Sequence, residues 1–194
     1  MAEPIDARLY HRDVRLADGG VIHIRAIRPD DKQRLQGLFR SLSDQSIYYR
    51  FFSRKRQLSP EDLDYLTGID MVRHVALAAT VPTVPRTGSS GSSDREEEII
   101  GVGRYAVQGH GRAEVAYAVA DAHQHRGIGS ILLQHLATIA HGAGLDTFVA
   151  NVLPENVTLQ LAFLTRNGFC PTITLTHGVA QLSFPLGARE NDVE

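Results

Sequence analysis

The sequence predicts an α/β fold in which helices cover the faces of one mixed β-sheet. Three observations lead to this fold class. Strand-like and helix-like segments follow one another in the order β-β-α-α-β-β-β-α-β-α-β-β. Two strand–helix–strand joins lie between residues 115 and 175, and such joins are expected to be right-handed crossovers. A glycine-containing turn leads from one of these strands directly into its helix.

The first elements are expected to be a hairpin and several short helices. Residues 21–27 alternate apolar and polar side chains, which is typical of a half-buried strand, and the turn at 18–20 lets residues 14–16 pair with it. Pro29 suits the first turn of a helix, and the two acidic residues after it favour the positive end of the helix dipole. The elements expected next are a short helix or turn over 43–52, a helix after Ser59 and a strand over 75–79.

Residues 81–98 interrupt this alternation because prolines, glycines, serines and then charged side chains replace the apolar ones. Such a composition cannot bury enough apolar surface to fold by itself. We therefore expect a disordered loop at about 82–98 between two strands of one sheet, and not a linker between domains. The length of 194 residues and the hydrophobic content of 43% suit a single domain over residues 1–194.

The second half of the chain has clearer signals. Strands over 99–107 and 113–120 flank a turn at 109–111. The apolar side chains of a helix over 130–141 fall on one face. The elements expected after this helix are a strand over 147–152, a helix capped by Asn156 and a final hairpin over 171–175 and 178–184.

Composition limits the classes of partner. The net charge of −2 gives no general attraction to nucleic acid or to a membrane surface, and no apolar run approaches 18 residues. The single cysteine, Cys170, excludes an internal disulfide and is expected to be a buried small hydrophobe, so a cytoplasmic location is expected. Basic residues cluster at Arg50 and at 54–56, either as a solvated surface or as a patch that meets phosphate or an acidic partner.

The stretch from Gln124 to Gly129 is expected to bind phosphate because it follows a strand and opens a helix. Gly127 and Gly129 have no Cβ atom, so an anion can approach the backbone. The first amides of the helix lack internal acceptors and lie at the positive end of its dipole. A Walker loop is excluded because the chain has no Gly-Lys pair, and a Rossmann turn lacks its third glycine. The alternative is a tight turn with no ligand.

The remaining pattern, Q-x-x-G-x-G, resembles the acyl-CoA-binding motif of the GCN5-related N-acetyltransferases (GNAT). A strand before it, a helix and a strand after it, and a helix that closes with Asn167-Gly168-Phe169 are similar to the core of that family. Segments 24–31, 49–52 and 101–105 are similar to bacterial Pat-type protein lysine acetyltransferases. The resemblance implies a mixed, mostly antiparallel central sheet, with acyl-CoA bound between two splayed parallel strands.

The resemblance also implies a function. The expected cosubstrate is acetyl-CoA, and the expected acceptor is the lysine side chain of a protein such as an acyl-CoA synthetase. A small-molecule amine acetyltransferase and a non-catalytic CoA-binding module are the alternatives. We expect a monomer or homodimer without nucleic-acid or membrane partners. No metal site is expected, because His123 and His125, or His135 and His141, lack zinc-ligand spacing with a third partner.

Glu114 is the candidate general base. Transfer of an acetyl group to lysine needs a neutral amine, and free lysine has a pKa of about 10.4, so a proton must be removed. Glu114 begins the strand that leads into the glycine turn, and its apolar sequence neighbours are expected to raise its pKa. It also matches the glutamate that Pat-type enzymes use. The alternative is a solvated carboxylate at the end of a strand.

Further roles follow from the resemblance alone. The N–H of Val119 would stabilise the thioester oxygen, and its carbonyl would bind pantetheine. The family's usual tyrosine acid is replaced by Leu164, so Tyr117 is a substitute candidate and the acid stays unassigned. The other expected cofactor contacts are Gln124, His125, Arg126, Gly127, Ile128, Gly129, Ser130 and Asn156.

Overall fold

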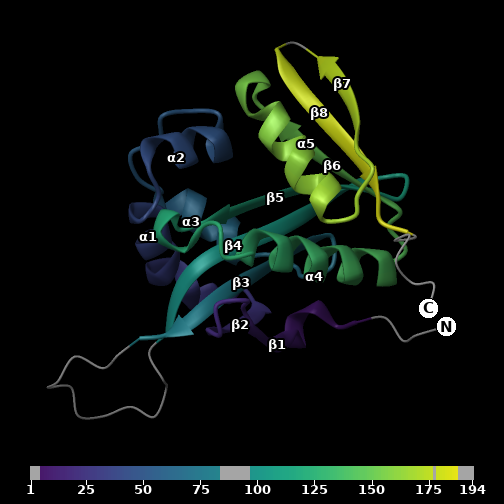
Figure 1. Cartoon of the computed structure of the whole chain (residues 1–194). Helices are drawn as coiled ribbons and strands as arrows, with labels where there is room; N and C mark the ends of the chain where they lie inside the picture. The colour runs from purple at the N-terminus through teal and green to yellow at the C-terminus, as the bar shows by residue number, and fades with distance from the viewer. Residues whose placement is uncertain (1–4, 84–96, 177, 188–194) are drawn as a thin grey trace, which may run out of the picture.

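One sheet runs through the structure, a computed structural model that describes residues 5–83, 97–176 and 178–187. Its strands are β1 (His11–Arg15), β2 (Val21–Ala26), β3 (His74–Pro82), β4 (Glu97–Gly109), β5 (Arg112–Val119), β6 (Thr147–Val152), β7 (Thr172–Thr176) and β8 (Val179–Pro185). Their order across the sheet is β1-β2-β3-β4-β5-β6-β8-β7 (Figure 1). β5 and β6 run parallel, and the other described pairs run antiparallel. The mixed, mostly antiparallel sheet is therefore confirmed.

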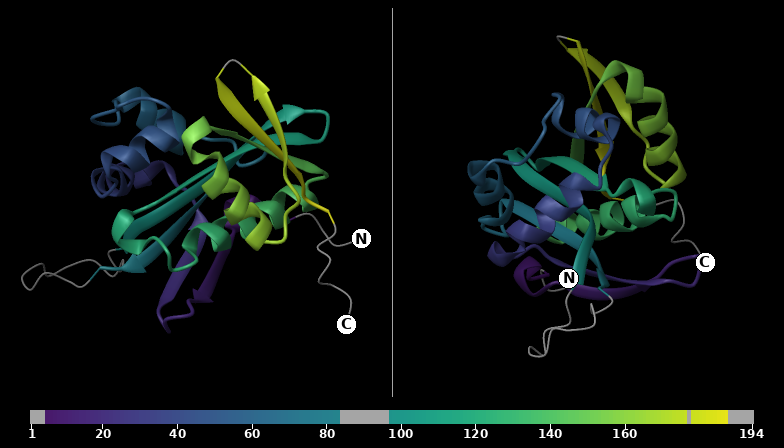
Figure 2. Two further views of the ribbon diagram at one scale, coloured as in Figure 1. Left: turned by 45° about the horizontal axis from the view of Figure 1, so that its top comes forward. Right: turned by 90° about the vertical axis from the view of Figure 1, so that its left-hand side faces the viewer.

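The helices form a layer on each face of the sheet (Figures 1 and 2). One layer contains α1 (Lys32–Arg40), α2 (Asp44–Phe51) and α3 (Pro60–Thr67), and the other contains α4 (Ile128–Gly142) and α5 (Val157–Arg166). The described part of the chain also contains four single-turn 3-10 segments: η1 (Ala7–Leu9), η2 (Pro29–Asp31), η3 (Asp121–His123) and η4 (Pro154–Asn156).

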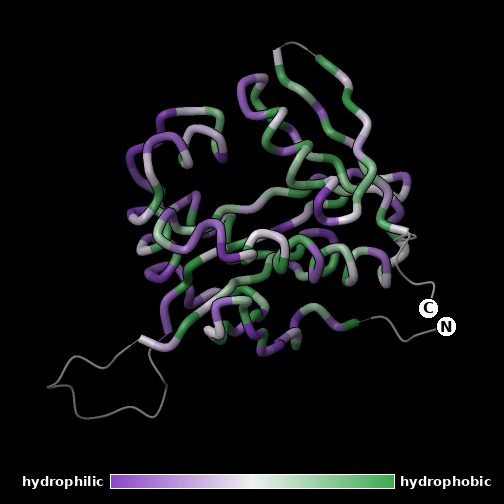
Figure 3. The backbone as a smooth tube through the Cα atoms, in the orientation of Figure 1, coloured by the Kyte–Doolittle hydropathy of each residue, from purple (hydrophilic) through white to green (hydrophobic). Residues whose placement is uncertain are grey.

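The sheet separates two hydrophobic cores, and β3 contributes to both. Val75 and Leu77 pack with the buried face of α4, whereas Ala76 and Ala78 pack with α1 and α3. Alternate side chains of a strand point to opposite faces. A central strand covered on both sides must therefore be apolar throughout, which explains the continuous apolar run of β3 (Figure 3).

A buried charged cluster fixes the entry to α1. Arg25 on β2 is 5% exposed, and its guanidinium donates to both carboxylate oxygens of the fully buried Asp31, at 2.7 and 2.8 Å. It also donates to Glu97, the first residue of β4, at 2.8 Å. Burial alone would raise the pKa of Asp31, but the hydrogen bonds from Arg25 hold it below its ordinary value.

Two details differ from expectation. α4 begins at Ile128 and not at Ser130, because Gly127 takes the left-handed conformation with φ of 85° and ends the turn early. Cys170 is exposed and not buried, because it lies just before β7, an edge strand of the sheet.

The expected loop is bounded by the structure. Pro82 and Glu97 pair with each other in the ladder between β3 and β4, so both ends of the range 82–98 belong to strands. Residues 84–96, the rest of the expected loop, lie outside the described part of the chain. Among the described residues, no helix combines the length and apolar character that crossing a membrane requires.

Candidate active site

β5 and β6 stop pairing halfway along their length. The ladder between them contains the pairs Arg112–Thr147, Ala113–Phe148 and Glu114–Val149 and then ends. β5 nevertheless continues to Val119, where it still pairs with β4. Among the residues that the structure describes, the edge of β5 that faces β6 therefore has no strand partner beyond Glu114.

The backbone of this unpaired edge can bind a ligand. The amide of Ala120 donates to the carbonyl of Ile100 at 2.9 Å, so alternate amides of β5 face β4. The amides of Tyr117 and Val119 consequently face the other side, where β6 has separated. The carbonyl of Val119 accepts a hydrogen bond of 3.1 Å from the side-chain amide of Gln124.

The glycine turn presents free amides at the start of α4. Gly127 precedes the helix without a side-chain cap, and the first helical hydrogen bond runs from the Ile131 amide to the Gly127 carbonyl at 3.0 Å. The amides of Ile128, Gly129 and Ser130 therefore have no intrahelical acceptor. They lie at the positive end of the α4 dipole, which favours an anion.

Glycine occupies the two positions of the turn, 127 and 129, for different reasons. Gly127 has a φ of 85°, which a side chain would strain. A Cβ atom at Gly129 would lie 3.7 Å from Phe163 and 3.8 Å from Tyr117, which is ordinary contact. The protein's own packing therefore does not demand glycine at position 129, whereas close approach of a ligand would.

Gln124 points into the protein. Its side-chain nitrogen is within hydrogen-bond distance of the Val119 carbonyl, of Asp121 at 3.1 Å and of the Ser46 hydroxyl at 3.3 Å. Ser46 lies on α2, so Gln124 ties the turn to the end of β5 and to the opposite helical layer. The side chain holds the shape of the turn and does not extend from it.

Arg126 is likewise engaged with the protein. Its Nε donates to Asp18 in the β1–β2 turn at 2.6 Å, and its Nη1 lies 2.9 Å from Nδ1 of His123. The hydrogen bond with Asp18 raises the pKa of Arg126 and lowers that of Asp18. The guanidinium of Arg126 therefore holds the glycine turn against the β1–β2 turn. His125 is exposed, with a φ of 60°.

Glu114 occupies the last position of β5 that pairs with β6, and it is half-buried. Its carboxylate accepts hydrogen bonds from the side-chain amides of Asn151 at 3.0 Å and Gln108 at 3.1 Å. The apolar neighbours Val115 and Val119 pack on the opposite, α4 face. The carboxylate is therefore surrounded by polar amides and not by its sequence neighbours.

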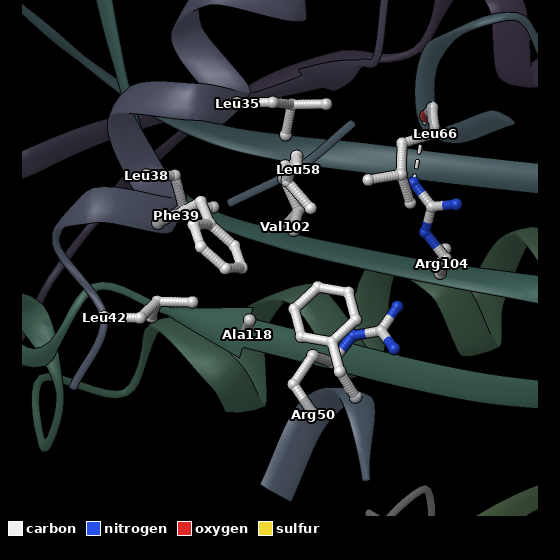
Figure 4. A pocket seen from close by; sticks show the side chains of 11 residues that line it. Leu35, Leu38, Phe39, Leu42, Arg50, Leu58, Leu66, Val102, Arg104 and Ala118 are labelled. Atoms are coloured by element: carbon white, nitrogen blue, oxygen red, sulfur yellow. Dashed lines mark hydrogen bonds between the residues drawn. The ribbon is translucent and has the colours of Figure 1, made fainter. Parts of the chain in front are cut away.

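Two arginines share the sheet face of Glu114. Arg104 lies opposite Ala116 in the β4–β5 ladder, while Ala106 lies opposite Glu114. Arg104 and Arg50, from α2, both line an apolar pocket between α1, α2 and the sheet (Figure 4). This position was not expected for Arg50, because a charge cluster in the sequence does not reveal which member turns inward.

Tyr117, the substitute candidate for the general acid, and Leu164, which occupies the usual acid position, both lie on the α4–α5 face. The hydroxyl of Tyr117 donates to Gln160 on α5, and its ring packs against Phe163 with the centroids 5.2 Å apart. Burial raises the pKa of Tyr117, which keeps the hydroxyl protonated. Leu164 is 3% exposed and belongs to the core.

Asn156 precedes α5, but its side chain makes no capping hydrogen bond, so the expected capping role is wrong. Its backbone, with φ of −103° and ψ of −3°, is not in the extended conformation from which a side chain usually caps a helix. The residue is 7% exposed. Within the described residues, no group of three or more histidine, cysteine or acidic side chains could hold a metal ion.

Comparison with known proteins gives consistent matches. Residues 85–169 match the model of the family described as "Acetyltransferase (GNAT) family". An acetyltransferase of Pseudomonas aeruginosa is 31% identical over 66% of this chain and 64% of its own length. The acetyltransferase Pat of Mycolicibacterium smegmatis is 30% identical over 76% of this chain and 41% of its own length.

A solved structure matches over more of its length. The crystal structure of the GNAT domain of PAT from S. lividans is 36% identical, with a TM-score of 0.76. The match covers 90% of this chain and 96% of that domain. The chain therefore spans nearly all of the solved domain, but less than two thirds of either curated relative.

Proposed function

We propose that this chain, which belongs to the acetyltransferase (GNAT) family, transfers an acetyl group from acetyl-CoA to an amine, and that the acceptor is a lysine side chain of a protein. The observation that carries the proposal is the layout of β5. Its candidate base, Glu114, stands where pairing with β6 ends. Unpaired amides follow it along the strand, and the turn with free helix amides comes next.

The cofactor would use these groups in order. The diphosphate of CoA would lie against the amides of Ile128, Gly129 and Ser130, where the helix dipole favours negative charge. The pantetheine arm carries amides, and it would extend along the free edge of β5 like an added strand. His125, an exposed residue of the turn, and Asn156 beside α5 are proposed as further contacts.

Strand spacing separates the roles of the two unpaired amides. At about 3.3 Å per residue, the Tyr117 amide lies about 10 Å from Glu114 along β5, and the Val119 amide about 16 Å. The amide nearer the base suits the oxygen of the thioester, which gains negative charge during attack. We therefore assign the Tyr117 amide to that oxygen, in addition to the Val119 amide that the resemblance implies. The Val119 carbonyl is proposed to contact pantetheine.

The chemical step is direct attack. Glu114 would accept a proton from the acceptor ammonium, directly or through water. The neutral nitrogen would form a bond with the acetyl carbon, and the bond from that carbon to the CoA sulfur would break. The nitrogen then loses its second proton to solvent or to the departing thiolate, so the products are an amide and CoA. CoA thiolate is a stable leaving group, so the step does not require Tyr117 as an acid.

A protein acceptor is supported by the similarity to Pat-type sequences across the first half of the chain. An acyl-CoA synthetase is the proposed example. Arg50 and Arg104 beside Glu114 disfavour a polycationic acceptor such as a polyamine, because like charges repel at short range.

The proposal is tested by labelling a bacterial lysate. The purified chain is incubated with radiolabelled acetyl-CoA and lysate, and labelled proteins are identified by mass spectrometry, with Glu114→Gln as the control. We expect acetyl-lysine on a small set of proteins with the unaltered chain alone. Label confined to small amines would contradict the protein acceptor. Absence of any heat of acetyl-CoA binding in calorimetry would contradict the function altogether.

A further inference from the structure

Arg104 is a buried cation with an unsatisfied nitrogen. Arg104 is only 7% exposed. Its Nη2 donates to the Leu66 carbonyl at 2.9 Å, and its Nη1 lies 3.1 Å from Nε2 of His74. Its Nε has no hydrogen-bond partner among the described residues. A buried guanidinium without a carboxylate is costly, so an anionic partner would relieve it.

Arg50 adds a second positive charge to the same place. Its guanidinium stacks 5.1 Å from the centre of the Phe51 ring, and no ion pair or hydrogen bond of its side chain occurs within residues 5–83, 97–176 and 178–187. Burial, together with the charge of Arg50, lowers the pKa of Arg104 to about 9. The two cations therefore repel each other, and the charge of Glu114 only partly offsets the effect of burial, which lowers the pKa of Arg50 as well.

Both arginines line one pocket, which we call the Arg50–Arg104 pocket. Its other walls are apolar, with Leu38, Phe39 and Val102 among them. The arginine side chains lie toward one end and the leucines of α1 toward the other (Figure 4). The cavity volume is about 30 Å³, which admits a small group such as a carboxylate but not a large ligand.

The pocket adjoins the candidate base. Arg104 is opposite Ala116, and Glu114 is two residues before Ala116 on the same strand, so Arg104 and Glu114 are diagonal neighbours on one face. Such neighbours are about 7–8 Å apart. Ala118, further along the same face of β5, lines the pocket itself. The proposed CoA turn belongs to α4, on the opposite face of the sheet, so the proposed diphosphate contacts do not occupy this pocket.

We propose that the Arg50–Arg104 pocket is a subsite for a carboxylate that the acceptor carries a few atoms from its reacting amine. The subsite deepens the proposed function and rests on it for the identity of the reacting group. The carboxylate has two sources, an acidic side chain near the target lysine of a protein or the carboxylate of a free amino acid. In either case, the acceptor places its ammonium group at Glu114 and its carboxylate at Arg50 and Arg104, so the arginines select acceptors that carry both groups.

The first test measures anion binding without turnover. Propionate is titrated into the protein while the Nε–Hε signals of its arginines are followed by NMR, with propionamide as the neutral isostere. We expect propionate to bind at least 10-fold more tightly than propionamide, because a hydrogen bond to a charged group contributes enough free energy for a difference of this size. Arg50→Gln should remove the difference. The exposed neighbour variant Arg54→Gln should bind propionate as the unaltered protein does. Equal binding of both probes, or full binding by Arg50→Gln, would overturn the subsite.

The second test measures selectivity. Pairs of lysine peptides differ by Glu or Gln at one position within three residues of the lysine, and lysine is compared with lysinamide as the free amino acid. We expect one pair to show a kcat/KM ratio of roughly 10 or more, which falls to about one in Arg50→Gln and persists in Arg54→Gln. A preference that Arg50→Gln leaves intact would overturn the proposal. Propionate binding without acetyl transfer to any acceptor would support the subsite while rejecting the transferase function.

Discussion

The carboxylate of Glu114 on β5 accepts a hydrogen bond of 3.0 Å from the side-chain amide of Asn151 on β6. These strands pair for the last time at Glu114 and Val149. The hydrogen bond therefore crosses between the strands at the point where they separate. The position of the candidate base is consequently coupled to the width of the opening in which the pantetheine arm is proposed to bind.

Replacing Glu114 by Gln should remove the proton acceptor while keeping the size of the side chain. We expect kcat to fall by about 100-fold or more, with the Kd of acetyl-CoA unchanged, because the CoA contacts are proposed on the backbone. Steady-state assays of acetyl transfer measure kcat, and calorimetry measures the Kd. Glu98→Gln, at an exposed position of β4, is the matched control. Full turnover by Glu114→Gln between pH 6 and 9 would remove Glu114 from the mechanism.

Asn151 is expected to act as a positioning residue. Asn151→Ala removes the donor to Glu114, and because small misplacement of a reacting group is costly, we expect kcat to fall by about 10-fold or more. The Kd of acetyl-CoA should stay constant, which a general loss of structure would not allow. Gln181→Ala is the control, since Gln181 contacts Asn151 at 3.4 Å and makes no described hydrogen bond with Glu114. Equal kinetics of the two variants would reject the role.

Features that depend on neighbouring residues could be predicted from the sequence. Two features were predicted correctly: the strand at residues 147–152, and the order in which a strand, a glycine turn and a helix follow one another. Both depend on side-chain periodicity and glycine conformation, which are local properties. The two-residue error at the start of α4 has the same local origin, since the pattern of apolar residues marks the buried face and not the first helical turn.

Features that depend on strand register could not be predicted. Gln108 and Asn151 reach Glu114 only because β4 and β6 flank β5 in a particular alignment. The contact of the Arg126 side chain with Asp18, 108 positions away in the chain, also depends on the alignment of distant segments. The inward position of Arg104 likewise follows from its place opposite Ala116.

Gly129→Asp should separate stability from cofactor binding. The positive end of the α4 dipole stabilises a carboxylate in the first turn of the helix. Aspartate also has a higher helix propensity than glycine, so the melting temperature should rise or stay constant. The same charge would repel the diphosphate, and we expect the Kd of acetyl-CoA to rise by about 10-fold or more. Thermal unfolding and calorimetry test both signs.

The control for this charge is Thr138→Asp, at an exposed position in the middle of the same helix. It adds an identical carboxylate away from the free amides and should leave the Kd unchanged. Unaltered binding by Gly129→Asp would mean that the diphosphate does not lie at the start of α4.

The cluster of Arg25, Asp31 and Glu97 should govern stability in acid. The pKa of Asp31 lies below its ordinary value of 3.8, and the pKa of Glu97 is also lowered, in each case because hydrogen bonds from Arg25 outweigh the effect of burial. A lowered pKa means that the contribution is complete above the ordinary value and is lost as pH falls through the folded-state pKa. We therefore expect the free energy of unfolding from this cluster to be constant between pH 7 and 5 and to fall below about pH 4.

Asp31→Asn tests the origin of that loss. Removing one partner leaves Arg25 buried with less compensation, so the free energy of unfolding should fall by about 3–5 kcal/mol at pH 7. The difference from the unaltered protein should shrink as pH falls, because the natural carboxyl then becomes neutral as well. Asp30→Asn, at the exposed neighbouring position, should cost less than about 1 kcal/mol. Urea unfolding at pH 7, 5 and 3 measures these values, and parallel curves for Asp31→Asn and the unaltered protein would show that acid acts through other groups.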